Sequence, residues 1–79
     1  MSENAAPTFG AWLKTRRRAQ DVTQKQLAEQ AQCAEITIRK IEANALRPSK
    51  NLTRVLLKEL AVPRAEQKSL VALARQKNR

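Results

Sequence analysis

The sequence lacks several residue types that catalytic and cofactor-binding sites require. It contains no histidine, one glycine and one cysteine. No nucleophile stands at a useful spacing from a base, so acid–base or covalent catalysis is not indicated. The single cysteine, Cys33, cannot build a zinc site, and no glycine-rich loop is present to hold a nucleotide. We therefore expect a protein that is not an enzyme and that uses no cofactor and no metal ion.

Long apolar runs and turn-forming residues are also scarce. No stretch approaches the roughly 18 apolar residues of a transmembrane helix, so we expect no membrane-spanning segment. The N-terminal MSENAAPTF has no charged region followed by an apolar stretch, which argues against a secretory signal. Because a lone cysteine cannot form an internal disulfide, a reduced, cytoplasmic setting is indicated. One glycine and three prolines disfavour a sheet with many tight turns.

Acidic residues are few, and basic residues are many. Sixteen Lys and Arg face seven Asp and Glu, which gives a net charge of +9 and a pI near 10.9. A surplus of this size favours polyanionic partners such as DNA, RNA or an anionic membrane surface. The alternative is that the charge serves only solubility.

Helical spacing of the apolar residues and the placement of capping residues predict an all-α domain. Thr8 is an N-cap for the first helix and Ser49 for the fourth, while Thr23 and Gln26 fit a capping box at the second. We predict helices over residues 9–19, 24–31, 35–43, 50–60 and 64–76. They form one domain, residues 8–77, after a disordered tail over residues 1–7. The apolar faces define the expected core: Phe9, Trp12, Leu13, Leu27, Ala28, Ala31, Ile38, Ile41, Leu52, Val55, Leu56, Leu60, Leu70, Leu73 and Ala74.

The second and third predicted helices are separated by only three residues, Gln32, Cys33 and Ala34. Two short helices with so short a connection cannot lie side by side antiparallel and must cross steeply, which is the helix-turn-helix arrangement. In a chain this basic, the dominant use of that unit is to place its second helix in the major groove of DNA. Cys33, in the turn, is expected to pack against the core.

Several segments together resemble one family. FGAWLKTRR falls in the first helix, TQKQLA and TIRKIEA fall in the second and third, and RPS and a Leu-rich closing helix follow. The pattern, from Phe9 to about Arg75, is similar to that of the phage-repressor and Cro-like helix-turn-helix proteins, the XRE family. Among these it looks most like the N-terminal DNA-binding segments of larger bacterial regulators. The resemblance implies a compact five-helix, lambda-repressor-like fold that binds double-stranded DNA sequence-specifically in transcription regulation.

Three positions depart from the family pattern. Gln32 stands where the family usually has glycine, and Ala34 stands where it usually has a serine or threonine cap. The missing cap costs about 1 kcal/mol. Asn44 replaces a glycine after the third helix, and asparagine tolerates the left-handed conformation of that position. We expect these replacements to weaken the fold without removing it, and to favour a turn of altered geometry.

A helical wheel separates two sides of the third helix. Ile38, Ile41 and Glu42 share the side that must face the core. The opposite side, which the family also uses, should meet base edges with three residues: Glu35, Ile36 and Lys40. Lys40 can donate to guanine O6 and N7, Glu35 can accept from cytosine N4, and Ile36 can contact a thymine methyl. The alternative for Ile36 is partial burial beside the turn cysteine.

Gln24 lies at the N-terminus of the second helix, where free amides and the helix dipole attract phosphate. Resemblance to the family implies that Gln24 hydrogen-bonds the DNA backbone. Further candidates for backbone contact are the polar and basic residues on or near these two helices: Thr23, Lys25, Thr37, Arg39, Asn44 and Arg47. The alternative for this second group is a solvated surface.

The resemblance also pairs Arg17 with Glu42, and a bidentate ion pair there would pin the first helix against the third. Arg17 belongs to a basic run, Arg16–Arg18, that can be read as a nuclear signal or an RNA-binding arm. Because side chains in a helix splay to different faces, one structural and two surface arginines is the simpler interpretation.

A single domain of this size reads few base pairs, so we expect a homodimer on two half-sites or fusion to a larger protein. The fifth helix offers a surface for such contacts: Leu70, Val71, Leu73 and Ala74. Two rivals to the DNA-reading function remain open, an antitoxin-like protein-interaction module and non-specific nucleic-acid binding. The partner expected first is double-stranded DNA, at the nucleoid, with no membrane partner.

Overall fold

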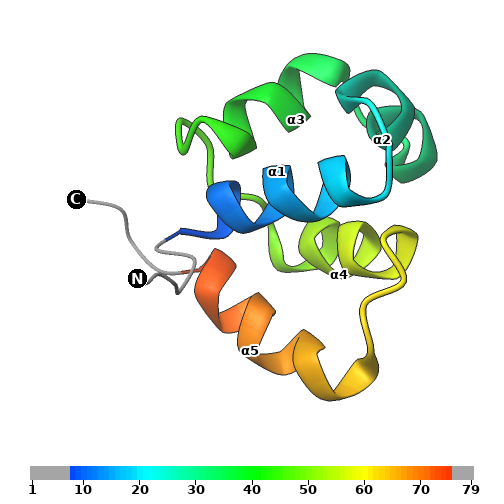
Figure 1. Ribbon diagram of the computed structural model, residues 1–79. Coiled ribbons are helices and arrows are strands. Elements are labelled where there is room, and N and C mark those ends of the chain that lie inside the picture. The colour runs from blue at the N-terminus through cyan, green and yellow to red at the C-terminus, as the bar shows by residue number, and fades with distance from the viewer. Residues whose placement is uncertain (1–7, 76–79) are drawn as a thin grey trace, which may run out of the picture.

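Five helices occupy residues 8–75, the part of the chain that the computed structural model describes (Figure 1). They are α1 (Phe9–Ala19), α2 (Gln24–Ala31), α3 (Glu35–Glu42), α4 (Lys50–Glu59) and α5 (Arg64–Ala74). No strand is present among these residues, so the predicted all-α, five-helix fold is confirmed. The predicted tail over residues 1–7 and the predicted domain end at residue 77 lie outside the described residues.

The predicted N-caps form their hydrogen bonds. The hydroxyls of Thr8 and Ser49 each accept a backbone N–H from the first turn of their helix, at 3.1 Å and 3.0 Å. At α2 the capping box is complete, because Gln26 N donates to Thr23 Oγ1 at 3.0 Å and Thr23 N donates to Gln26 Oε1 at 2.9 Å. α3 has no side-chain cap, since Ala34 carries no acceptor.

The C-terminal ends of three helices differ slightly from the predicted ones. α3 ends at Glu42 rather than Ala43, and α4 ends at Glu59 rather than Leu60. In both helices the predicted last residue is the C-cap, whose amide still bonds to the helix while its backbone angles leave the helical range. α5 ends at Ala74; its predicted end, residue 76, lies outside the described residues.

Four connections turn on a residue with left-handed backbone angles, although none of the four is glycine. They are Asp21 (φ 58°), Gln32 (φ 59°), Asn44 (φ 61°) and Ala61 (φ 55°). The sequence predicted this conformation for Asn44. Gln32 adopts the angles that glycine favours, and amides of Gln32 and Cys33 bond to carbonyls in the last turn of α2. The turn between α2 and α3 is therefore closed in the usual way for a helix end.

α1 lies across the middle of the molecule, and α3 and α5 lie at opposite ends (Figure 1). α2 contacts α3 and α4, α1 contacts α3 and α5, and α4 contacts α5. α2 and α3 cross at a steep angle, as their three-residue connection requires (Figure 1). This arrangement leaves one long side of α3 without a neighbouring helix.

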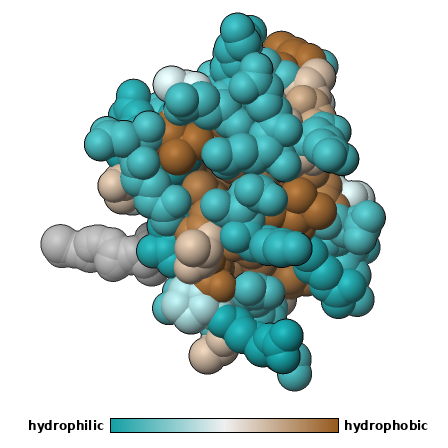
Figure 2. Space-filling model, turned by 90° about the vertical axis from the view of Figure 1, so that its right-hand side faces the viewer, coloured by the Kyte–Doolittle hydropathy of each residue, from teal (hydrophilic) through white to brown (hydrophobic). Residues whose placement is uncertain are grey.

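Every helix contributes apolar residues from one side to the core. The fully buried side chains include Leu13, Leu27, Ile38 and Leu56. Five predicted core residues are only half-buried at its edge: Trp12, Leu52, Val55, Leu70 and Leu73. Two further apolar residues of the core were not singled out by the pattern: Leu57 and Val62. Leu57 is buried because both α2 and α5 contact α4, and Val62 lies in the connection between α4 and α5. Apolar residues reach the surface only as separate patches on the side shown in Figure 2.

The sole glycine marks the place where α1 comes closest to α3. A Cβ atom on Gly10 would overlap the carbonyl oxygen of Ile41 and lie 3.0 Å from that of Glu42. It would also lie 2.6 Å from Asn44 Oδ1. The position of α3 relative to α1 therefore depends on the absence of a side chain at residue 10.

Candidate nucleic-acid interface

α3 has one buried side and one exposed side. Ile38 and Ile41 are 0 % and 1 % exposed, and the side chain of Glu42 is 3 % exposed. The three predicted base-reading residues all lie on the exposed side: Glu35, Ile36 and Lys40. Ile36 is 46 % exposed, and its contact with a thymine methyl stays a prediction. We call this exposed side the outer face of α3.

A buried ion pair holds the inner side of α3 against α1. Arg17 Nε and Nη2 donate to Glu42 Oε2 and Oε1 at 2.7 Å and 2.9 Å, and Arg17 Nη1 donates to the carbonyl oxygen of Val22 at 2.8 Å. The hydrogen bonds to Glu42 raise the pKa of Arg17, so its guanidinium stays charged. The structure thus brings together the two residues that the family resemblance pairs. A bidentate contact fixes the rotation of α3 about its own axis.

Gln24 is a third member of this network. Its Nε2 donates to Glu42 Oε1 at 3.0 Å, and its side chain is half-buried. This contact was not predicted, because it joins the first residue of α2 to the last residue of α3 and depends on how the two helices cross. Gln24 therefore links the two helices of the unit. Its contact with a DNA phosphate stays a prediction.

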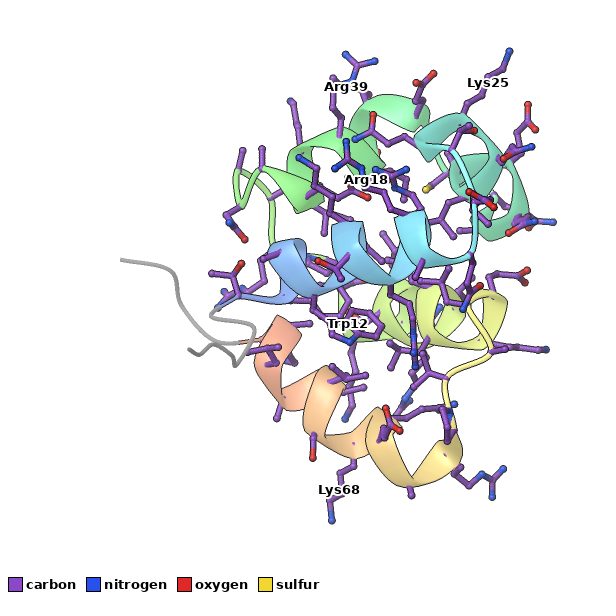
Figure 3. All side chains as sticks on the ribbon, viewed as in Figure 1. Trp12, Arg18, Lys25, Arg39 and Lys68 are labelled. Atoms are coloured by element: carbon purple, nitrogen blue, oxygen red, sulfur yellow. The ribbon has the colours of Figure 1, made fainter. Side chains whose placement is uncertain are left out.

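A shallow groove of about 410 Å³ lies where α1 and α2 approach the start of α3. Its lining includes three exposed cations, Lys14, Arg18 and Lys25, together with Thr23 and the carboxylate of Glu35. Figure 3 shows Arg18 directed from α1 toward the end of the molecule from which Lys25 and Arg39 project. We call it the α1–α2 groove. It places positive charge directly beside the outer face of α3.

Lys14 and Arg18 were not among the predicted site residues. They are four residues apart on α1, so their side chains lie on one face of the helix. That spacing was a signal in the sequence. It did not identify the site, because only the packing of α1 against α3 brings this face beside the outer face of α3.

The other predicted backbone-contacting residues are distributed along α3 and the loop that follows it. Arg39 is exposed, and its Nη2 lies 3.7 Å from a carboxylate oxygen one turn earlier on α3. Thr37 is half-buried, and Asn44 is exposed just past the helix. Arg47 Nη1 donates to the carbonyl oxygen of Arg75 at 2.9 Å, which ties the loop to the end of α5. The structure does not gather these residues into one cluster.

Cys33 is half-buried against the core, as its place in the turn predicted. Burial raises the pKa of its thiol and so disfavours the reactive thiolate. Among residues 8–75, no group of three His, Cys, Asp or Glu is placed to hold a metal ion. None of the described helices is long and apolar enough to cross a membrane.

A family model for the helix-turn-helix domain matches residues 8–70, from the N-cap of α1 into α5. The matched segment contains α2, the turn and α3, and it includes every residue predicted to contact DNA. A search of curated proteins and a search of solved structures each found no match.

Proposed function

The chain belongs to the helix-turn-helix domain family, and from this premise we propose that it binds specific sequences of double-stranded DNA and regulates transcription. In this proposal α3 enters the major groove with its outer face toward the base edges. The observation that carries it is the exposure of Ile36 among polar side chains on the side of α3 opposite the core. Ile36 is 46 % exposed, and a partner that covers this apolar side chain lowers the free energy of the system.

Each residue of the outer face suits a different base edge. Lys40 donates to guanine O6 and N7, Glu35 accepts from cytosine N4, and Ile36 contacts the C5-methyl group of thymine. The exposed contact between Glu35 and Arg39, at 3.7 Å, is worth little, so Arg39 can turn to a phosphate when DNA is bound.

Phosphate contacts set the position of α3 in the groove. On one side of α3, the cations of the α1–α2 groove face one DNA strand, with Thr23 and Gln24 at the start of α2. Arg39, in the second half of α3, and Asn44 and Arg47, in the following loop, face the second strand. Thr37, two residues before Arg39, flanks the outer face on its other side. The buried network of Arg17, Glu42 and Gln24 holds α3 from behind while both strands are contacted.

Selection of bound sites from a random duplex pool, followed by competition with excess random duplex, tests sequence-specific binding. A specific reader keeps the selected duplex, whereas a purely electrostatic binder exchanges it for the competitor. We expect Lys40→Ala to change the preferred base at one position, at a cost of about 1–3 kcal/mol for the original site. We expect Lys25→Ala to weaken binding to all duplexes alike. Lys58→Ala, on the exposed side of α4, is the matched control. Equal effects of Lys40→Ala and Lys25→Ala on every duplex would overturn the proposal.

The contact of Ile36 has its own test. Replacing thymine by uracil at successive positions of the selected site removes one methyl group at a time. Wild-type protein should bind more weakly at one of these positions, and Ile36→Ala should show no such position. If uracil is tolerated everywhere by the wild-type protein, Ile36 does not read thymine.

One copy of α3 covers few base pairs, so we propose that two copies act on paired half-sites or that the domain works within a larger protein. The mass of the complex with the selected duplex counts the copies. Tight binding of one copy to a single half-site would contradict this part of the proposal.

A further inference from the structure

A second basic surface lies between α4 and α5, and α5 is at the end of the molecule opposite α3 (Figure 1). It is a groove of about 540 Å³, which we call the α4–α5 groove. Five of its eight lining residues are basic: Lys50, Arg54, Arg64, Lys68 and Arg75. None of the eight is acidic. Figure 3 shows Lys68 projecting from α5 in the direction opposite to Lys25 and Arg39.

The cations of the α4–α5 groove have no evident role in holding the described residues together. The ion pairs among residues 8–75 are Arg16–Glu66, Arg17–Glu42 and Arg39–Glu35, and none includes a cation of the groove. Lys50 and Arg64 are the first residues of α4 and α5, where positive charge opposes the helix dipole. Charge at these positions therefore costs stability, and a ligand that accepts it would offset that cost.

The three remaining lining residues are Gln67, Val71 and Ala72, and two of them are apolar. The groove therefore favours an anionic ligand that also has an apolar surface. Val71 is half-buried and Ala72 is exposed, and both line the groove between the basic residues of α4 and α5. Arg64, Lys68 and Ala72 follow one row of α5 at a spacing of four residues, with Val71 in the next row. We call Val71 and Ala72, which basic residues of both helices border, the apolar strip of the groove.

We propose that the α4–α5 groove binds an acidic amphipathic segment of a partner protein. Apolar side chains of that segment would cover Val71 and Ala72, and its carboxylates would pair with the flanking basic residues. A volume of about 540 Å³ accommodates several side chains from one face of a helix. A DNA duplex presents phosphates but no apolar ridge, so it matches only half of this surface. The inference goes beyond DNA binding and does not depend on it, because the groove is remote from the outer face of α3.

Isotope-edited NMR of the whole chain tests the proposal with a defined probe. The probe is a capped helical peptide with a leucine stripe between two rows of glutamate, and its control is the same peptide with the order of residues scrambled. Saturable chemical-shift changes confined to α4 and α5, with the scrambled peptide bound about ten-fold more weakly, would support the proposal. Equal binding of the two peptides would overturn it, as would shifts centred on α3. Displacement of the peptide from the groove by a short DNA duplex would assign the groove to nucleic acid instead.

Variants separate this site from general attraction of acidic peptides. The double variant Arg54→Glu with Lys68→Glu should lower the peptide affinity at least about ten-fold, because two exposed contacts become repulsive. Lys58→Glu reverses one charge outside the groove and should have little effect. Ala72→Lys is the sharper test, since it adds positive charge but interrupts the apolar strip. It should weaken binding of the amphipathic peptide, and tighter binding would overturn the proposal. The double variant should bind duplex DNA as the wild-type protein does.

Discussion

Glu42 is a carboxylate with a side chain 3 % exposed, and it accepts hydrogen bonds from Arg17 and Gln24. A buried ion pair is a weak source of net stability, but removing one partner leaves the other charge uncompensated. We therefore expect Arg17→Met to lower the free energy of unfolding by about 3 kcal/mol. In a domain of this size that lowers Tm by more than about 10 °C in thermal unfolding.

The double variant Arg17→Met with Glu42→Met is the control, because it leaves no buried charge. It should recover most of the lost stability. A single variant Arg17→Met as stable as the wild-type protein would show that the pair does not hold α3 in place.

Ala61 has left-handed backbone angles (φ 55°) and is exposed, with only a methyl group to interact with its surroundings. This conformation costs a non-glycine residue about 1–2 kcal/mol. Glycine avoids that cost, but it makes the unfolded chain more flexible, which lowers the stability of the folded state by about 0.4–1 kcal/mol. We expect Ala61→Gly to raise the free energy of unfolding by about 0.5–1 kcal/mol and Tm by a few degrees. Ala72→Gly, exposed within α5, should instead lose about 1 kcal/mol. Equal losses in both variants would contradict the strain assigned to Ala61.

Burial raises the pKa of the Cys33 thiol, and this predicts a change of stability with pH. A group whose pKa is higher in the folded protein binds more protons there, so its stabilising contribution is complete below the unfolded pKa, about 8.5. That contribution is lost as the pH rises through the raised pKa of the folded state. Unfolding by urea at neutral and at alkaline pH measures it. Wild-type protein should lose more stability than Cys33→Ala over this interval, and identical losses would contradict the prediction.

At the scale of elements, the crossing of α1 over α3 depends on Gly10. A Cβ atom there would overlap the carbonyl oxygen of Ile41, which belongs to the backbone and cannot turn aside. We expect Gly10→Ala to lower the free energy of unfolding by about 2–3 kcal/mol, although alanine is the better helix former. Thr15→Ala, at an exposed position of the same helix, should be neutral or slightly stabilising in the same thermal unfolding experiment. If both variants gain stability, the two helices can move apart without cost.

The sequence predicted the existence of all five helices because capping residues and apolar spacing are local signals. The hydroxyls of Thr8, Thr23 and Ser49 each accept a hydrogen bond from the amide three residues later. The role of Gly10 was not predicted, since it depends on a carbonyl more than thirty residues away in α3. Leu57 was missed for the same reason: the wheel of α4 shows an apolar face but not that helices cover it from two sides.

One part of the candidate site could also be predicted from local sequence signals, and another part could not. The outer face of α3 follows from the wheel, because Ile38 and Ile41 fix which side is buried. The α1–α2 groove does not, because Lys14 and Arg18 enter the site only through the packing of α1 on α3. In the sequence, Lys14 and Arg18 are indistinguishable from ordinary surface residues. Their place beside the outer face of α3 is set by the tertiary structure.

At the scale of the whole molecule, basic residues gather on two separate surfaces. One is the outer face of α3 with the α1–α2 groove, and the other is the α4–α5 groove. The molecule extends 32 × 26 × 23 Å, and the Debye length at 0.1 M salt is about 10 Å. Charges at one end are therefore largely screened from a ligand at the other, so one basic chain can hold two kinds of acidic partner.

This separation predicts how DNA affinity depends on salt. Each phosphate neutralised by the protein adds about 0.9 to the magnitude of the slope of log K against log salt concentration. We expect Lys25→Ala, beside the outer face of α3, to reduce that magnitude by about 0.9 when affinity for the selected duplex is measured by fluorescence anisotropy over a salt series. Lys68→Ala, at the opposite end, should leave the slope unchanged, because its ammonium group lies beyond the reach of the duplex. Equal reductions by the two variants would mean that the duplex has no preferred face of the molecule, and binding would then be electrostatic attraction to the whole basic surface.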